Sequence, residues 1–462
     1  MLKQNRNKNI TSGNLFLGIL QFAIPLFIST LVQNLFTAAD TAIAGNFAGG
    51  GAVAAIGAGN PVITLLVGSF TAFATGTGIV VAKYVGARDA QNIKNTVDTA
   101  VLFAGAFGVA LMVASMFLSV PVLKVMDSPA ECFDDAVLYL RIYMVGVPAS
   151  MVYNFAAAII RAEGDSSRPL VYIMISGTIN VVTNVLLCLI LPNKVAAVAI
   201  ATVLSQVVSA TLAMNHLMRK KDGFCKFSLK NATFKFRSLG EILRYGIPLV
   251  VSTAIYPLAN LQIQPAINSF GAANLAGGTA VISIDSVSGA LQSAFNSTCV
   301  TFMAQNIGAH NKKRAMQAFW LSGLCSMLSG LVLGNLCGRV FSEELLELFL
   351  PDYPEAVAMG QIRLRYTTSN NWLSAIMGWI SASLQALGYP AFTTVNNLVC
   401  VLGFRIVWMN FVYPLNPVVE MLYICYLVSW SLTTVFGSVV LVIAFKKYKQ
   451  KERQYLLEHP IK

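Results

Sequence analysis

Long uncharged runs separated by short polar connections dominate the pattern of this 462-residue chain. An uncharged run covers residues 11–39, a single aspartate follows at Asp40, and residues 41–82 are again uncharged. Runs of this kind recur to the end of the chain, and about 20 apolar residues are enough for a helix to cross a bilayer. The runs lack the two-residue alternation of barrel strands, so the pattern predicts membrane-spanning helices.

We predict twelve spans and therefore an all-α polytopic membrane protein. The spans lie at 13–38, 52–80, 98–121, 137–160, 169–191, 195–217, 243–266, 275–303, 315–338, 360–387, 391–411 and 418–445. Composition agrees with this prediction, because 56% of the residues are hydrophobic and only 11% are charged. An ordinary soluble domain is about a quarter charged.

The net charge of +12 is distributed in a way that points to membrane topology and not to nucleic acid. Lys and Arg collect in alternate connections and at both ends, from Lys3, Arg6 and Lys8 to the tail segment "KKYKQKER" (446–453). By the positive-inside rule both termini are cytoplasmic, which requires an even number of spans. We therefore expect a multi-pass protein of the cell (inner) membrane, in contact with the lipid bilayer and without a nucleic-acid partner. The N-terminus shows no pattern of a cleaved signal peptide.

The chain repeats itself at an offset of about 223 residues. The segment "AIPLFIST" (23–30) matches "GIPLVVST" (246–253), and "AKYVGARDAQNIK" (82–94) matches "AQNIGAHNKKRAM" (304–316). Each half holds six predicted spans, so both halves enter the membrane with the same orientation, an arrangement found in transporters with two lobes. The predicted organisation is an N-terminal lobe (1–218), a basic cytoplasmic linker (219–242), a C-terminal lobe (243–446) and a cytoplasmic tail (447–462).

These motifs resemble the multidrug and toxic compound extrusion (MATE) family over nearly the whole chain. The features that carry the resemblance are "IP" in span 1, "GIP" in span 7, "AADTAIAG", "GARD", "IIRAEGDSSRPL", "INVVTN", "AQNIGAHNKKRA" and "LQALGYP". Each is weak alone, but their order and spacing over twelve spans are specific. The lipid-linked oligosaccharide flippases of the same superfamily share the fold, so a flippase is the alternative.

Asp40 is the first candidate functional residue. A carboxylate at mid-membrane costs about 2.5–3.5 kcal/mol on insertion scales, so it faces a cavity, carries a proton or pairs with a cation. The alternative places Asp40 at the outer end of span 1, in the interface. Its equivalent in the second half is Ile263, and an acid present in only one half favours a function over a scaffold role.

The resemblance implies an ion-coupling site in the N-terminal lobe, as in one prokaryotic branch of the family. The matching positions are Asp40, Asn154, Asn180, Asn184 and Thr202. Asn and Thr side chains at such positions also serve as contacts between helices, which is the alternative. The family often has a second aspartate where this chain has Asn184, so the coupling ion is expected to be H⁺ before Na⁺, without any cofactor. Pro25 is a candidate hinge in span 1, or simply a tolerated kink.

The second lobe departs from another branch of the family, which places acids in spans 7 and 10. The first position is Tyr256 here, and span 10 offers "TTSNNW" (367–372) without an acid. Asp285 in span 8 is the remaining intramembrane acid of this lobe. Asp285, Arg405 and Tyr256 are candidates for a substrate cavity, and the alternative for Asp285 and Arg405 is a structural ion pair.

The residue inventory argues against an enzyme. The three histidines, His216, His310 and His459, lack ligand spacing, and no Gly-rich loop with Lys-Ser/Thr is present for ATP. The eight scattered cysteines are expected to be small packing residues. We expect a secondary active antiporter that exports organic, often cationic, small molecules in exchange for H⁺ or Na⁺, acting as a monomer. The alternatives are a flippase, for which only Arg405 lies clearly inside a span, and a non-transporting receptor or scaffold.

Overall fold

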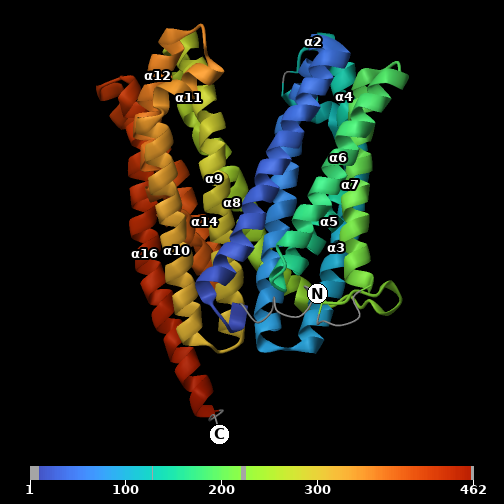
Figure 1. Cartoon of the computed structure of the whole chain (residues 1–462), viewed down its shortest axis with the longest axis vertical. Coiled ribbons are helices and arrows are strands. Elements are labelled where there is room, and N and C mark those ends of the chain that lie inside the picture. Colours follow the sequence, from blue (N-terminus) through green and yellow to red (C-terminus); the bar gives the residue numbers. More distant parts are fainter. Residues whose placement is uncertain (1–9, 127, 220–224, 459–462) are drawn as a thin grey trace. The chain divides into compact units, whose positions relative to one another are not determined.

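The computed structural model describes residues 10–126, 128–219 and 225–458, and these residues form helices without any strand. The all-α fold predicted from the apolar runs is confirmed (Figure 1). Several sequence predictions concern residues outside these ranges and are not described: those on Lys3, Arg6, Lys8, His459 and residues 220–224 of the linker.

The first six predicted spans are present as helices, with one break. The long helix α2 (Leu15–Ala87) holds two candidate spans, Leu15–Phe47 and Val53–Ala87, seen as two limbs in Figure 1. The helices that follow are α3 (Ala90–Val125), α4 (Phe133–Val145), α5 (Val147–Ala162), α6 (Ser167–Ile190) and α7 (Lys194–Arg219). The fourth predicted span is bent by 45° between α4 and α5, where Gly146 is followed by Pro148 at the start of α5.

The second half is more fragmented. Its helices are α8 (Phe236–Ser269), α9 (Gly271–Gly308), α10 (Lys312–Asn335), α11 (Ser342–Phe349), α12 (Pro354–Tyr366), α13 (Asn371–Leu387), α14 (Pro390–Asn397), α15 (Phe404–Val407) and α16 (Val419–Glu458). Two π-helical turns, Leu398–Gly403 and Trp408–Val412, connect α14, α15 and the following chain into one candidate span. Such π turns are frequent at functional sites.

Within the described residues, nine helices are long and apolar enough to cross a membrane, or ten with the bent pair. The two other predicted spans, 275–303 and 360–387, are helical in α9 and in α12–α13 but are more polar. Asp285 lies within α9, while α12 carries Arg363 and is separated from α13 by a short 3₁₀ turn, Thr368–Asn370. The least apolar spans of the protein are thus the ones that contain these charges.

The chain divides into two compact units, Ile28–Val250 and a second unit made of Met1–Phe27 with Val251–Lys462. The two division points, after Phe27 and after Val250, are 223 residues apart, which is the offset of the sequence repeat. Each unit therefore includes the start of the other half's first helix. We call this part of each half its entry segment, which is 10–27 for the first half (15–27 of it in α2) and 236–250 of α8 for the second. The predicted lobes did not anticipate this exchange.

Backbone conformations repeat along with the sequence. Arg88 and His310 are the two non-glycine residues of positive φ among those described, at 56° and 54°. Each is followed by a residue that caps the next helix, Asp89 before α3 and Asn311 before α10. Both caps accept a hydrogen bond from a backbone N–H three residues later, which satisfies a donor that the helix leaves unpaired. The two matching motifs thus fold into the same turn.

The entry segment of α2 is anchored by one arginine of α10. Arg314 donates from Nε to the carbonyl oxygen of Ile10 at 2.7 Å, and from its two Nη atoms to those of Ser12 and Gly13 at 2.8 and 3.0 Å. Carbonyls before the first turn of a helix are ready acceptors, and a guanidinium can reach several of them at once. The start of α2 is therefore attached to the unit that contains Val251–Lys462.

The entry segment of α8 is anchored to the other unit by side chains near the end of α2. Tyr84 donates to Glu241 Oε2 at 2.6 Å, and Lys83 Nζ lies 2.5 Å from the hydroxyl oxygen of Tyr245. The helix begins at Phe236, seven residues earlier than predicted, because these contacts stabilise its first turns. The basic linker thus ends inside a helix and not in a free loop.

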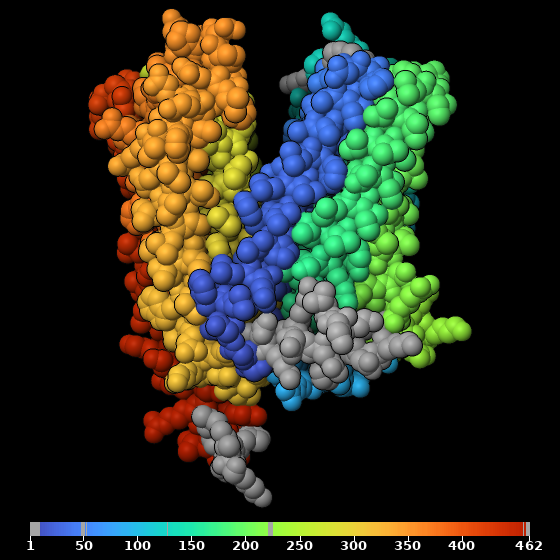
Figure 2. Space-filling view, in the orientation of Figure 1, coloured from blue at the N-terminus to red at the C-terminus, as the bar shows by residue number. Residues whose placement is uncertain are grey.

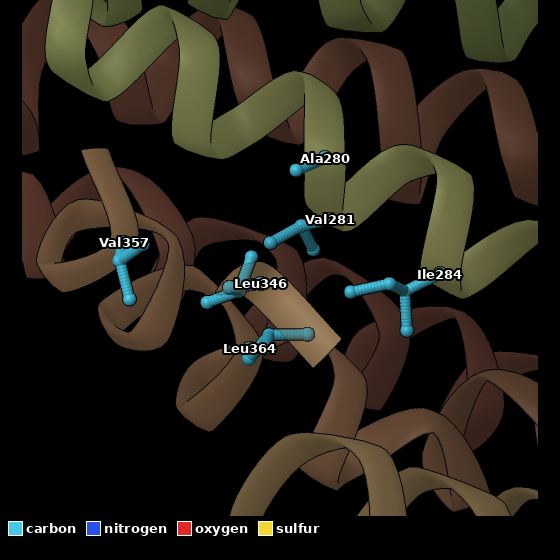
Figure 3. Close-up of a cluster of buried hydrophobic side chains, with 6 residues drawn as sticks. All are labelled: Ala280, Val281, Ile284, Leu346, Val357 and Leu364. Carbon is cyan, nitrogen blue, oxygen red and sulfur yellow. The ribbon is translucent and has the colours of Figure 1, made fainter. Parts of the chain in front are cut away.

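Both units expose many large apolar side chains, and Figure 2 shows the molecule in space-filling form, coloured along the sequence. Examples are Phe117, Ile190 and Leu415, each at least 75% exposed. An apolar surface of this extent requires a nonaqueous environment. Inside the second unit, one core cluster joins α9 to α11 and α12 (Figure 3). Its members are Ala280, Val281, Ile284, Leu346, Val357 and Leu364.

Candidate ion-coupling and substrate sites

Asp40 lies within α2 and not beyond its end. The first span extends to Phe47, nine residues past the predicted end, since the alanines around Asp40 favour helix and no proline interrupts them. The carboxylate is therefore about two helical turns from the end of the span, and its side chain is half-buried.

Asn184 of α6 is the partner of Asp40. Its amide nitrogen Nδ2 donates to Asp40 Oδ1 at 3.0 Å, although the two residues are 144 positions apart. Asn184 is completely buried, and its own Oδ1 accepts from the Cys188 thiol at 3.6 Å. The amide thus presents a donor and not an oxygen to the carboxylate.

Asn180 lies one turn before Asn184 on α6 and is 4% exposed. Its side-chain oxygen Oδ1 is buried without a hydrogen-bond donor in the described part of the chain. Buried polar atoms are normally paired, so an unpaired acceptor at this place requires an explanation such as a proton-carrying group or a water molecule.

Asn154 and Thr202 form hydrogen bonds away from Asp40. Asn154 donates to the Ser150 carbonyl at 2.8 Å and accepts from the Thr71 hydroxyl at 3.4 Å. Thr202 donates to the carbonyl of Val198 in its own helix at 3.0 Å. The structure thus joins Asp40 to Asn184, whereas these two predicted members contact other groups.

Two aromatic residues near Asp40 were not predicted. Tyr139 of α4 lies close enough for an electrostatic interaction with the Asp40 carboxylate, and its ring lies 3.6 Å from where a Cβ at Gly59 would be. Phe36, one turn before Asp40, packs onto Gly177 of α6 so closely that no Cβ fits there. The glycine in "ISGTIN" was a usable signal, since a small residue allows a close helix contact.

Pro25 lies in the interior of α2, which continues through it without interruption. The helix passes from one compact unit to the other two residues later, after Phe27. A proline inside a helix removes one backbone hydrogen bond and favours bending at that point.

The unit containing Val251–Lys462 has a cavity of about 140 Å³, which we call the C-unit cavity. Its lining includes Asp285, Gln292, Arg363, Asn371, Tyr426 and Trp430. These residues come from α9, α12, α13 and α16, and all belong to one unit. The core cluster of Figure 3 helps to position the charged residues that line this cavity. Its members Ile284 and Leu364 are the sequence neighbours of Asp285 and Arg363.

Asp285 is bound by the segment that follows α12. Its Oδ1 accepts from the Thr368 hydroxyl at 2.7 Å and from Asn371 Nδ2 at 3.1 Å. The alternative of an ion pair with Arg405 is therefore wrong, since Arg405 donates from Nη1 to Asn260 Oδ1 at 2.7 Å instead. The segment "TTSNNW", which lacks an acid, supplies donors to an acid on another helix.

Arg363 of α12 is a second arginine near the cavity, and it was not among the predicted site residues. Its Nη1 donates to the carbonyl of Gly278 at 3.1 Å, and its guanidinium lies 5.8 Å from the centre of the Tyr423 ring. The approach of α9 to α12 depends on glycine, because a Cβ at Gly277 would lie 2.7 Å from the backbone nitrogen of Gly360. The prediction that only Arg405 lies clearly inside a span was wrong, because Arg363 also lies within the predicted span 360–387.

Arg405 and Tyr256 lie near each other, beside the C-unit cavity and not in its lining. Arg405 is 2% exposed, and its guanidinium lies 4.2 Å above the ring of Tyr426. Tyr256 packs against the buried cluster around Ile255 and is close enough to Arg405 for an electrostatic interaction. Tyr426 connects this pair to the cavity that Asp285 lines, since its ring contacts Arg405 and belongs to the lining.

Comparison with known proteins gives the family. The family model MatE matches residues 25–186 and 248–410, two segments whose starts are again 223 residues apart. The chain is 26% identical over 359 residues to "Probable multidrug resistance protein YpnP" of Bacillus subtilis (strain 168), covering 78% of this chain and 79% of that protein. It is 21% identical to "Probable multidrug resistance protein NorM" of Thermotoga maritima, covering 80% of each.

Solved structures agree on the fold. The chain is similar to "Outward-facing conformation of a multidrug resistance MATE family transporter of the MOP superfamily", with a TM-score of 0.88 and 19% identity over 97% of this chain and 100% of that one. A second, "Crystal structure of MATE in the bent conformation", has a TM-score of 0.87 with 20% identity over 97% and 100%. The family match, the twofold repeat and these folds lead to one conclusion: the chain belongs to the MatE family of multidrug efflux transporters, as the resemblance predicted.

Proposed function

We propose that this protein is a secondary active antiporter, which exports organic and often cationic compounds by alternating access in exchange for protons. The observation that carries the proposal is the bond between Asp40 and Asn184 inside the first span. A carboxylate within an apolar span needs compensation, and protonation is the simplest way to switch its charge. In this proposal the ion gradient supplies the energy, and no cofactor takes part.

The contacts of Asn184 favour H⁺ over Na⁺ as the coupling ion. A hard cation prefers several oxygen ligands, yet the atom that Asn184 directs at the carboxylate is a nitrogen donor. A proton on Asp40 would turn one acceptor into a donor, and Asn180 Oδ1 is a buried acceptor on the same helix face.

Pro25 is the proposed hinge of this cycle. The entry segment of α2 is anchored by Arg314 in one unit, while Asp40 belongs to the other. A change in the hydrogen bonds of Asp40 therefore acts on one side of Pro25 while the other side is held. Such a change of charge biases a helix between two arrangements.

The C-unit cavity is the proposed substrate site, and Asp285 is the acidic residue that would contact the substrate. Arg405 and Tyr256 are proposed to position Tyr426, which lines the cavity. A flippase for a lipid-linked oligosaccharide is not favoured, since the relatives are multidrug resistance proteins and a carboxylate lies beside Arg363 in this cavity. We further propose that the protein acts as a monomer in the bacterial cell membrane, with both termini in the cytoplasm.

The test is flux in proteoliposomes loaded with a fluorescent organic cation, under separately imposed H⁺ and Na⁺ gradients. We expect a pH gradient to drive export and a Na⁺ gradient to have no effect. The variant Asp40→Asn should lose pH-driven export and keep its fold, because an amide can still bond to Asn184. The control is Asp134→Asn, which changes an exposed acid in the first turn of α4 in the same way. Wild-type export rates in Asp40→Asn would refute the proposal.

A further inference from the structure

The C-unit cavity holds two opposite charges that do not pair with each other. Asp285 and Arg363 both line it and interact electrostatically, yet they form no ion pair within 4.0 Å in the described structure. Opposite charges close together in a region of low dielectric normally pair, because each is costly to bury alone. The two charged groups are therefore more than 4.0 Å apart, and both lie in the lining of one cavity.

Each of the two charged groups keeps an unused atom. Asp285 receives both of its hydrogen bonds on Oδ1, so Oδ2 has no donor among the described residues. Arg363 uses Nη1 for the carbonyl of Gly278, and its Nη2 has no acceptor in the same part of the chain. A charged oxygen and a charged N–H are therefore both available within one cavity.

The remaining lining residues include both polar and aromatic side chains. Gln292 is fixed by contacts with Ser288 Oγ at 3.3 Å and with the Asn371 carbonyl at 3.4 Å. Tyr426 and Trp430 meet edge to face, with ring centres 6.1 Å apart. Arg405 covers one face of the Tyr426 ring, so the indole of Trp430 is the other aromatic surface in the lining with Asp285. An aromatic surface near a carboxylate favours an ammonium group, and quaternary ammonium compounds in particular. The volume of about 140 Å³ is below the roughly 300–1,000 Å³ of pockets for drug-sized ligands, so the occupant is small.

We propose that the C-unit cavity binds a small zwitterion, whose ammonium group faces Asp285 and whose acidic group faces Arg363. A simple cation satisfies Asp285 but is repelled by Arg363, and a simple anion has the opposite problem. A molecule with both charges satisfies both side chains at once, by charge-assisted hydrogen bonds on the anionic side. This inference rests on the proposed function only in taking the cavity as a substrate site.

Binding of three compounds of equal size to the purified full-length protein tests the charge pattern. The probes are glycine betaine (a zwitterion), choline (its cationic counterpart) and 3,3-dimethylbutanoate (its anionic counterpart), titrated by calorimetry. We expect betaine to bind at least tenfold more tightly than either counterpart. This comparison uses the unmodified protein and so does not depend on any variant folding.

Two variants then assign the charges. Asp285→Asn should weaken betaine and choline about tenfold or more, and leave the weak binding of 3,3-dimethylbutanoate unchanged or stronger. Arg363→Gln should weaken betaine and 3,3-dimethylbutanoate and strengthen choline, whereas Arg363→Lys should keep part of the betaine affinity. Thermal unfolding of each variant checks that it is folded, and Asp134→Asn is the matched control.

Three results would overturn the inference: equal affinity for the three probes, tightest binding of choline alone, and no binding of betaine at 50-fold the concentration that saturates a known zwitterion-binding protein. These outcomes are separate from the antiport proposal. If betaine binds as expected but no gradient drives export of any compound, the antiport proposal fails and the zwitterion site stands. If Asp40→Asn abolishes export while betaine does not bind, only the zwitterion site fails.

Discussion

Asn184→Asp is the most informative single substitution, since it introduces the second acid that the family resemblance leads us to expect at this position. The new carboxylate would lie where the Asn184 amide now donates to Asp40 at 3.0 Å. Two like charges about 4 Å apart repel by about 4 kcal/mol at an effective dielectric of 20. That energy corresponds to a factor of about a thousand in an equilibrium constant, so both carboxylates cannot stay charged without a cation or a proton between them.

We therefore expect Asn184→Asp to bind Na⁺, whereas the wild type responds to pH alone. The assay is the melting temperature of the purified protein in NaCl and in KCl at equal ionic strength. A ligand at 100 times its Kd stabilises the folded state by about 2.7 kcal/mol, so a clear upward shift in NaCl is expected for the variant only. The comparison variant is Asn154→Asp, whose side chain contacts Ser150 and Thr71 instead of Asp40.

A Na⁺ response in Asn154→Asp equal to that in Asn184→Asp would refute the reasoning, because it would show that contact with Asp40 is irrelevant. The same conclusion follows if Asn184→Asp shows neither a Na⁺ response nor a changed pH dependence of transport.

Three further predictions concern stability. Gly277→Ala should lower the free energy of unfolding by about 1–3 kcal/mol, because the new Cβ would lie 2.7 Å from the Gly360 nitrogen. The control is Gly240→Ala, which has open space around it and should show no such cost in the same thermal melts. Asn260→Leu should lower the free energy of unfolding by about 1.5–3 kcal/mol, because it removes the hydrogen-bond acceptor of the buried Arg405. The double variant with Arg405→Met should cost less than the sum of the two single changes. An additive result would contradict this contact. At the turn before α3, donation from the backbone N–H and the side-chain amide of Asn92 lowers the pKa of Asp89, which lies outside the spans. The stabilising effect of the Asp89 carboxylate is therefore present above the ordinary pKa of aspartate and is lost as the pH falls through the lowered pKa. Asp89→Ala should cost about 1 kcal/mol of the free energy of unfolding at pH 7 and progressively less below pH 4. A cost that grows on acidification would contradict the assignment.

The helices and the repeat could be predicted because they depend on local pattern. Apolar runs determine where a helix can cross the membrane, and the four-residue spacing of Asn180 and Asn184 places both on one face. The family resemblance grouped Asp40 with Asn184, and the two side chains are hydrogen-bonded in the structure. Their role in ion coupling stays a prediction. Arg363 was missed because a charge near the start of a span looks like a boundary residue.

Other features of the site leave no local pattern. Thr368 and Asn371 become partners of Asp285 only because α12 ends and α13 begins there, and a break between two short helices is hard to predict inside an apolar run. The early start of α8 depends on contacts with α2 about 160 residues away. Such pairings are decided by tertiary packing and not by the propensity of either segment.

The exchange of entry segments also has a consequence for the origin of the protein. Each compact unit is completed by a segment from the other half, so a single six-span half lacks a part of its own unit. A six-span ancestor with the same architecture would have had to borrow that segment from a second copy of itself, as domain-swapped dimers do. Fusion of two such copies would make the exchange intramolecular, because each half then meets its missing segment at the high local concentration that one covalent chain provides.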